Sequence, residues 1–141
     1  MKLKKKLIKI GGFILLIVTI GTSIFVYNYK KDESYAINLV KNQTSEIAPD
    51  VTFNQAYNKY LTNLSYTYYK DSNKNQFVCV SGRLYLKDRE KISDLKLTYL
   101  INENDGSLKF YDMQVDGAKY SELEALILKI KVYDSYDKTN V

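Results

Sequence analysis

The chain has 141 residues, of which 45% are hydrophobic and 26% charged, with a formal net charge of +5 at pH 7. This length is enough for one domain of ordinary size. Because the sequence has no histidine and a single cysteine, it excludes Ser-His-Asp and Cys-His catalysis, histidine metal sites, intramolecular disulfides and four-thiolate zinc sites.

The positive charge is confined to the N-terminus. Residues 1–31 contain seven lysines and no acidic residue, whereas residues 32–141 contain 14 basic and 16 acidic side chains. A nucleic-acid-binding surface needs an excess of positive charge against the phosphate backbone. We therefore expect no nucleic-acid partner.

Residues 10–29 form a long run without any charged side chain. As a helix rising about 1.5 Å per residue, this run would span roughly 30 Å, the thickness of the hydrocarbon core of a bilayer. Five lysines precede it and two follow it, which places the N-terminus in the cytoplasm. The apolar run continues beyond Gly21-Thr22-Ser23, which disfavours signal-peptide cleavage there.

These features predict a single-pass protein of the cell membrane. Residues 1–9 would be a basic cytoplasmic leader, residues 10–29 a transmembrane signal anchor and residues 32–141 an extracytoplasmic domain. The excess of lysine over arginine, with many Asn, Ile and Tyr residues, is typical of AT-rich genes and favours a Gram-positive bacterial host.

The local patterns of the exported part predict helices at both of its ends. Residues 35–41 either extend the membrane helix or form a short helix, and Pro49-Asp50 indicates a turn. Thr52 and Gln55 form a capping box that begins a helix. The apolar face of this helix comprises Phe53, Ala56, Tyr57, Tyr60, Leu61 and Leu64. A second capping box, Ser121 to Glu124, begins the last helix, whose apolar stripe comprises Leu123, Leu126, Ile127 and Ile130.

Between the two helices the apolar period changes to two, which indicates strands. The predicted strands cover residues 65–70, 76–87, 92–101 and 108–115, with a bulge at Gly82 and a hairpin at Asn104-Asp105-Gly106. Neither helix can bury its stripe alone. The predicted fold is therefore α+β, with a four-stranded antiparallel sheet and the helices packed on one face.

We expect no catalytic residue, no metal site and no cofactor, and hence no enzyme. Asp71, Asn73 and Asn75 have the spacing of a calcium loop, but Gln76 and Gly82 stand where that loop needs Gly and Glu. Cys79 lies in an apolar strand, which favours core packing over reactivity.

The uncovered face of the sheet is the candidate partner surface. If the odd-numbered residues 95–101 point to the helices, the alternate residues of that strand point outward. The first strand adds some of its tyrosines (Tyr66, Tyr68, Tyr69), and the fourth adds either Leu108, Phe110 and Asp112 or Lys109, Tyr111 and Met113. The predicted surface comprises Lys96, Thr98, Leu100 and Tyr111. An envelope protein or a cell-wall glycan would fit it, and an ordinary solvated face is the alternative.

Several short motifs resemble a domain found in uncharacterised membrane-anchored proteins of Gram-positive bacteria, often beside a zinc ribbon or a single transmembrane helix. The similar segments lie within residues 36–133 and are Leu39-Val40-Lys41-Asn42, Pro49-Asp50-Val51-Thr52-Phe53, Val78-x-Val80-x-Gly82 and Val115-Asp116-Gly117. The resemblance implies a small α+β extracytoplasmic domain and no activity. We therefore expect a membrane-anchored, non-catalytic binding or scaffolding domain.

A structural subunit of a pilin-like or secretion apparatus is the alternative function. The lysine-rich leader, Gly12-Phe13 and the apolar segment resemble a type IV prepilin. Ile17, however, stands where pilins carry a glutamate.

Overall fold

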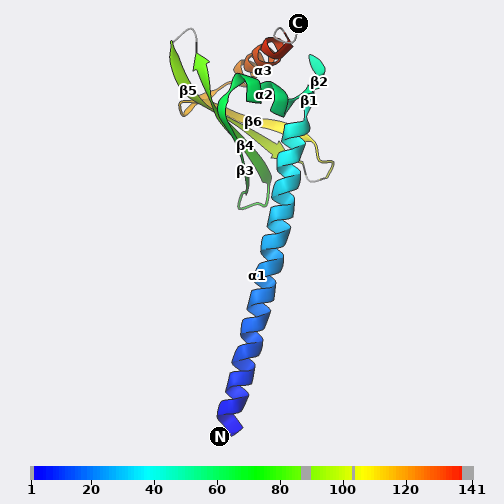
Figure 1. Ribbon diagram of the computed structural model, residues 1–141, viewed down its shortest axis with the longest axis vertical. Coiled ribbons are helices and arrows are strands. Elements are labelled where there is room, and N and C mark those ends of the chain that lie inside the picture. The colour runs from blue at the N-terminus through cyan, green and yellow to red at the C-terminus, as the bar shows by residue number, and fades with distance from the viewer. Residues whose placement is uncertain (1, 87–89, 103, 138–141) are drawn as a thin grey trace. The chain divides into compact units, whose positions relative to one another are not determined.

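The computed structural model describes residues 2–86, 90–102 and 104–137, with side chains from residue 22 onward. The chain forms two compact units, Met1–Ser34 and Tyr35–Val141. Helix α1 (Lys2–Asn42) is continuous, so residues 35–41 extend it (Figure 1). Within the second unit, Ala36 and Val40 of this helix are fully buried.

The expected membrane segment is only partly covered by these described side chains. Among the helices of the described residues, none is both long and apolar enough to cross a membrane. The expected leader (residues 1–9) and residues 10–21 of the expected anchor (residues 10–29) lie outside the residues with described side chains. The leader and the anchor therefore stay predictions.

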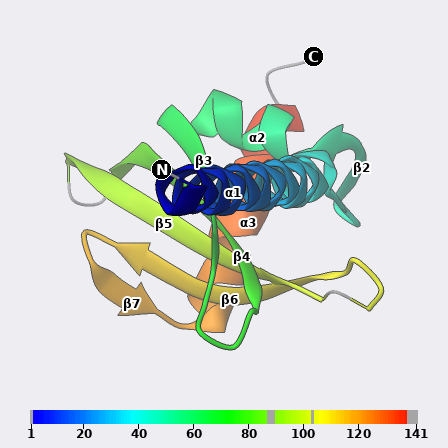
Figure 2. The ribbon, with the colours of Figure 1, turned by 90° about the horizontal axis from the view of Figure 1, so that it is seen from below.

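The second unit is an α+β domain built on an antiparallel sheet, as expected. The sheet has five strands in the order β3-β4-β5-β6-β7. Their bounds are β3 (Thr62–Lys70), β4 (Gln76–Leu86), β5 (Lys91–Ile101), β6 (Leu108–Val115) and β7 (Ala118–Tyr120). The expected four strands thus correspond to β3–β6. A fifth strand follows because Asp116 and Gly117 adopt φ values of 51° and 79°, a tight turn that returns β7 along β6 (Figure 2).

A separate two-stranded sheet pairs β1 (Thr44–Ser45) with β2 (Ala48–Thr52). Pro49 and Asp50 therefore lie within a strand, and the turn expected there is wrong. Proline is compatible with this position because a two-stranded sheet consists entirely of edge strands.

Helix α2 (Phe53–Tyr60) begins at the predicted capping box. The Gln55 side chain accepts the Thr52 backbone N–H at 2.8 Å, and the Thr52 hydroxyl accepts the Gln55 N–H at 3.3 Å. The helix ends earlier than expected, because Leu61 is already extended and Asn63 adopts a φ of 56°. Leu64 therefore lies in β3.

The irregularity expected at Gly82 lies on the neighbouring strand instead. The β3–β4 register shifts between Thr62 and Ser65, whereas Gly82 pairs regularly with Leu95. Gly82 is required for close approach, since a Cβ there would lie 3.0 Å from Leu61 Cδ1.

A group of aromatic rings lies in the domain core between the sheet and the helices α2 and α3. Phe53 stacks on Tyr57 at 4.0 Å between ring centroids and meets the Tyr99 ring edge-on at 5.7 Å. Tyr57 in turn meets Tyr133 of helix α3 (Glu122–Asp137) at 6.5 Å. Helices α2 and α3 therefore lie on the same side of the sheet (Figure 1).

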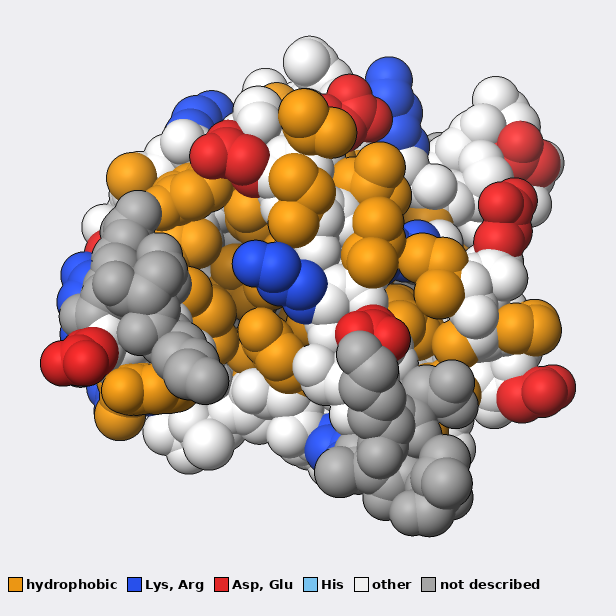
Figure 3. Space-filling model, turned by 90° about the horizontal axis from the view of Figure 1, so that it is seen from above, with side chains coloured by type: hydrophobic (Ala, Val, Ile, Leu, Met, Phe, Trp, Pro, Cys, Tyr) orange, Lys and Arg blue, Asp and Glu red, His pale blue; other side chains and the backbone are white. Residues whose placement is uncertain are grey.

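Helix α3 packs through a different face from the one predicted. Its buried residues are Ala125, Val132 and Tyr133. The expected apolar stripe is exposed instead, at 66% for Leu123, 50% for Leu126, 44% for Ile127 and 42% for Ile130. Figure 3 looks onto this end of the molecule, where hydrophobic side chains gather on the surface. This face is the buried one because the small Ala125 lets α3 lie close to the domain and because Tyr133 contacts the Tyr57 ring.

Candidate functional site

The face of the sheet opposite α2 and α3 carries the predicted partner surface, and we call it the open face. Register places Leu100 beside Phe77, Thr98 beside Cys79 and Lys96 beside Ser81. The alternate residues of β5 are buried under the helices, with exposures of 2% to 8% for Leu95, Leu97, Tyr99 and Ile101. The predicted alternation of this strand is confirmed.

Strand β6 reaches the open face through a bulge. Leu100 pairs with Lys109 and Tyr99 with Phe110, but Thr98 pairs with Asp112, so Tyr111 is the extra residue. The residues of β6 on the open face are Lys109, Tyr111, Asp112 and Gln114. Neither of the two alternating sets expected for this strand is therefore correct, because the bulge exchanges the faces halfway along it.

Three rings form an aromatic cluster on the open face: Tyr69, Phe77 and Tyr111. Tyr69 stacks on Phe77 with ring centroids 5.1 Å apart and planes 13° apart, and Tyr111 meets Phe77 edge-on at 5.1 Å. Phe77 is 6% exposed, whereas Tyr69 and Tyr111 are 40% and 61% exposed. The two tyrosines thus shield the phenylalanine and present their own rings to solvent.

The polar group of Tyr69 in this cluster is a neutral phenol. Partial burial raises the pKa of Tyr69 above its ordinary value of 10.0. Its hydroxyl is therefore protonated at neutral pH and can both donate and accept a hydrogen bond.

A shallow polar groove of about 480 Å³ lies on the same face as the aromatic cluster. Ser81, Lys96 and Gln114 line it, together with the exposed ion pair of Arg83 and Asp94 (Nε–Oδ1 3.2 Å). Beside it, the Gln114 amide donates to Asp112 Oδ2 at 2.6 Å, and the Lys119 ammonium lies 3.9 Å from the same oxygen. The open face therefore combines aromatic rings with both donors and acceptors of hydrogen bonds.

The structure brings all four predicted surface residues to the open face but exposes them unequally. Lys96 and Tyr111 are exposed and Leu100 is half-buried, whereas Thr98 is only 4% exposed and offers almost no contact area. Sequence reasoning missed Phe77, whose apolar side chain gives no sign that it points away from the helices.

The tyrosines of β3 divide between the two faces of the sheet. Tyr69 pairs with Phe77 and lies on the open face. Tyr68 is 3% exposed, and the Tyr66 hydroxyl donates to Asn54 Oδ1 of α2 at 3.0 Å. Only one of the three tyrosines therefore contributes to the candidate surface.

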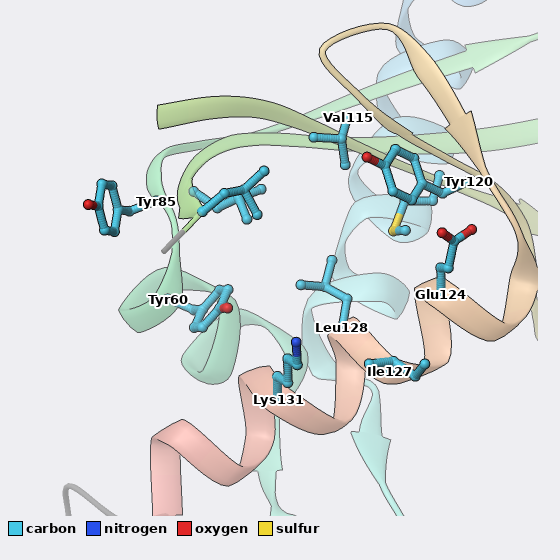
Figure 4. A pocket seen from close by; sticks show the side chains of 11 residues that line it. Tyr60, Tyr85, Val115, Tyr120, Glu124, Ile127, Leu128 and Lys131 are labelled. Carbon is cyan, nitrogen blue, oxygen red and sulfur yellow. The ribbon is translucent and has the colours of Figure 1, made fainter. Parts of the chain in front are cut away.

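A second concave site lies beside α3 on the helical side of the sheet. This cleft has a volume of about 700 Å³, and Figure 4 shows Leu128 of α3 and Tyr60 of α2 approaching it from one side and Val115 and Tyr120 of the sheet from the other. Partial burial raises the pKa of Tyr60, so its phenol is neutral. The lining of the cleft is mainly apolar, with Glu124 and Lys131 of α3 as its charged members.

The calcium-like spacing at residue 71 has a structural explanation. Asp71 Oδ1 accepts the backbone N–H groups of Asn73 and Asn75 at 2.9 Å each, and Oδ2 accepts the Asn75 side-chain amide at 2.8 Å. These hydrogen bonds lower the pKa of Asp71 and close the β3–β4 hairpin. Across the described ranges, no three Cys, Asp or Glu side chains lie close enough to hold a metal ion.

Comparison of the chain with protein-family models, with curated proteins and with solved structures finds no match in any of the three. The resemblance to extracytoplasmic domains of membrane-anchored proteins therefore stays a prediction. The assignment of function rests on the sequence and on the geometry of the open face.

Proposed function

We propose that this protein is a membrane-anchored, extracytoplasmic, non-catalytic binding domain whose open face binds a cell-wall glycan. The anchor is inferred from the uncharged run of residues 10–29 and from the lysines that precede it. The observation that carries the proposed binding is the aromatic cluster, which lies on the same face of the sheet as the polar groove.

The chemistry of the open face fits a sugar polymer. The C–H face of a pyranose ring packs on an aromatic ring, and Tyr69 and Tyr111 present such rings. Sugar hydroxyls need donors and acceptors nearby, which Ser81, Lys96 and Gln114 supply along the groove. Because Phe77 is held between the two tyrosines, their rings are positioned before binding.

Binding of the full-length protein to insoluble, purified peptidoglycan tests this proposal. The protein, kept in mild detergent, should sediment with the glycan, and Tyr111→Ser or Tyr69→Ser should weaken binding about tenfold if each stacked ring contributes on the order of 1.4 kcal/mol.

Tyr85→Ser is the matched control. Tyr85 is 60% exposed, almost the same as Tyr111, and lies on β4 outside the aromatic cluster. Equal losses for Tyr85→Ser and Tyr111→Ser would refute a specific site. Binding to an envelope protein in the absence of any glycan binding would refute the glycan as the partner.

A further inference from the structure

The exposed stripe of α3 is an apolar surface that the described residues of this chain leave open to solvent. Ala125, Val132 and Tyr133 bury one side of the helix against its own domain. The opposite side exposes four large aliphatic side chains, Leu123, Leu126, Ile127 and Ile130, each 42% to 66% exposed. A helix that is apolar on both sides is typical of an element buried between two partners.

Charged residues flank the stripe in an ordered way. Glu122 and Lys129 lie on one flank, where both line a cleft of about 530 Å³. Glu124 and Lys131 lie on the other flank, where both line the cleft of about 700 Å³. On each flank the acidic residue is nearer the N-terminus and the basic residue nearer the C-terminus.

The segment of α3 that carries the stripe, residues 122–131, has the same order of apolar and charged positions when it is read backwards, but with the opposite charges. Glu-Leu-Glu-Ala-Leu (residues 122–126) is followed by Ile-Leu-Lys-Ile-Lys (residues 127–131). Reversal of the segment reproduces the pattern of apolar and charged positions, with every acid replaced by a base. A helix with this property complements a second copy of itself in the antiparallel direction.

We propose that α3 pairs with α3 of a second copy of this chain, antiparallel about a two-fold axis between residues 126 and 127. Leu126 then packs beside Ile127 of the second copy, and Leu123 beside its Ile130. On the flanks Glu122 meets Lys129 of the second copy. These two are offset by two residues, about 3 Å along the axis, within the reach of their side chains.

The second flank pairs Glu124 with Lys131 of the second copy at the same offset. Glu124 Oε2 already accepts hydrogen bonds from the backbone N–H and hydroxyl of Ser121, at 2.8 and 2.7 Å, so the lysine approaches Oε1. A parallel arrangement would instead place Glu122 beside Glu124 and Lys129 beside Lys131, which like-charge repulsion disfavours. The charge pattern therefore selects both the partner and its direction.

Disulfide cross-linking of the full-length chain tests the register. In a Cys79→Ser background, Leu126→Cys should form a disulfide-linked dimer under mild oxidation, because the two copies of residue 126 lie about 1.5 Å apart along the axis. Leu123→Cys is the matched control. Its two copies lie about 10 Å apart along the axis, so it should remain monomeric on denaturing gels although Leu123 is the more exposed side chain.

Equal cross-linking at both positions would refute the antiparallel register, because a parallel pair brings every residue beside its own copy. Cross-linking at neither position would refute the dimer. The partner of the stripe would then be a protein other than a second copy of this chain.

A charge-reversal cycle tests the flanks. Glu122→Lys and Lys129→Glu should each weaken dimerisation of the full-length chain in detergent about tenfold, because each converts two attractive pairs into two repulsive ones. The double variant should restore the dimer, since the exchanged charges attract again. Sedimentation equilibrium measures this association, and a double variant as weak as the single variants would overturn the proposal.

Discussion

Replacement of Gly82 by alanine probes the close approach between β4 and the residues Leu61 and Thr62, where the chain passes from α2 into β3. The added Cβ would lie 3.0 Å from Leu61 Cδ1, 3.1 Å from Leu61 Cβ and 3.3 Å from the Thr62 carbonyl oxygen. Ordinary carbon contacts are about 3.5–4.0 Å, so Leu61 must move by a few tenths of an ångström. Leu61 is 4% exposed and its backbone N–H bonds to the Tyr57 carbonyl at 2.8 Å, which leaves it little room.

Overpacking of this kind costs about 1–3 kcal/mol, and the gain from removing a glycine from a strand offsets about 0.5–1 kcal/mol of it. We therefore expect Gly82→Ala to lower the free energy of unfolding by about 1–2 kcal/mol. Urea unfolding of the full-length chain, followed by tyrosine fluorescence, measures this change.

The Leu61→Ala variant identifies the cause. Alone it should cost about 2–4 kcal/mol, because it truncates a buried leucine. It also removes the Cδ1 atom that Gly82→Ala would strike, so the double variant should lose about 1 kcal/mol less than the sum of the single changes. Additive losses, or a fully stable Gly82→Ala protein, would refute the close-approach role of the glycine.

Three further predictions follow from other regions of the chain. The combined change of Leu100→Ser and Tyr111→Ser should lower the free energy of unfolding by about 1–2 kcal/mol, since Leu100 is half-buried and Tyr111 packs edge-on against Phe77. A loss of more than about 4 kcal/mol in thermal unfolding would show that this face is core. The hydrogen bond from Lys91 (2.6 Å), supported by the Asp94 N–H and the Ser93 hydroxyl, lowers the pKa of Asp116 from 3.8 to about 2. The stability from this carboxylate should therefore be present above pH 4 and be lost as the pH falls to 2, and Asp116→Asn should remove that part of the pH profile of unfolding. Mass spectrometry of the mature chain should find Met1 at the N-terminus, whereas an N-terminus at Phe13 would favour the pilin-like alternative. Protease added to intact cells should digest the C-terminal domain, and protection of that domain would refute the topology.

The parts of the fold that depend on short-range hydrogen bonds were predictable from the sequence. The capping boxes at Thr52 and Ser121 begin α2 and α3 at the expected residues, because a cap is satisfied within three residues of itself. The four longer strands were predictable from the alternation of apolar and polar side chains along the sequence. Strand β5 also has the predicted buried face.

The errors occur where two local solutions compete and only tertiary packing decides between them. Helix α3 is apolar on two sides, so periodicity alone could not show that Ala125 and Tyr133, rather than Leu126 and Ile127, meet the sheet. In β6 a single inserted residue, Tyr111, exchanges the faces of the strand. A bulge without a glycine leaves no mark in the sequence, and the half of the candidate surface that depends on β6 could not be placed in advance.

The two proposed surfaces lie on opposite sides of the sheet, which has a consequence for binding. A dimer formed through α3 leaves the aromatic cluster of each copy uncovered, so one dimer presents two open faces. Because a glycan polymer repeats its binding unit, the proposed glycan binding would bring the second face to its site at a high effective concentration once the first is engaged. Glu122→Lys should therefore weaken retention on insoluble peptidoglycan, although Glu122 lies on the other side of the sheet from Tyr69 and Tyr111, and the added Lys129→Glu change should restore it. Unchanged retention of the monomeric variant would show that each open face binds the glycan independently.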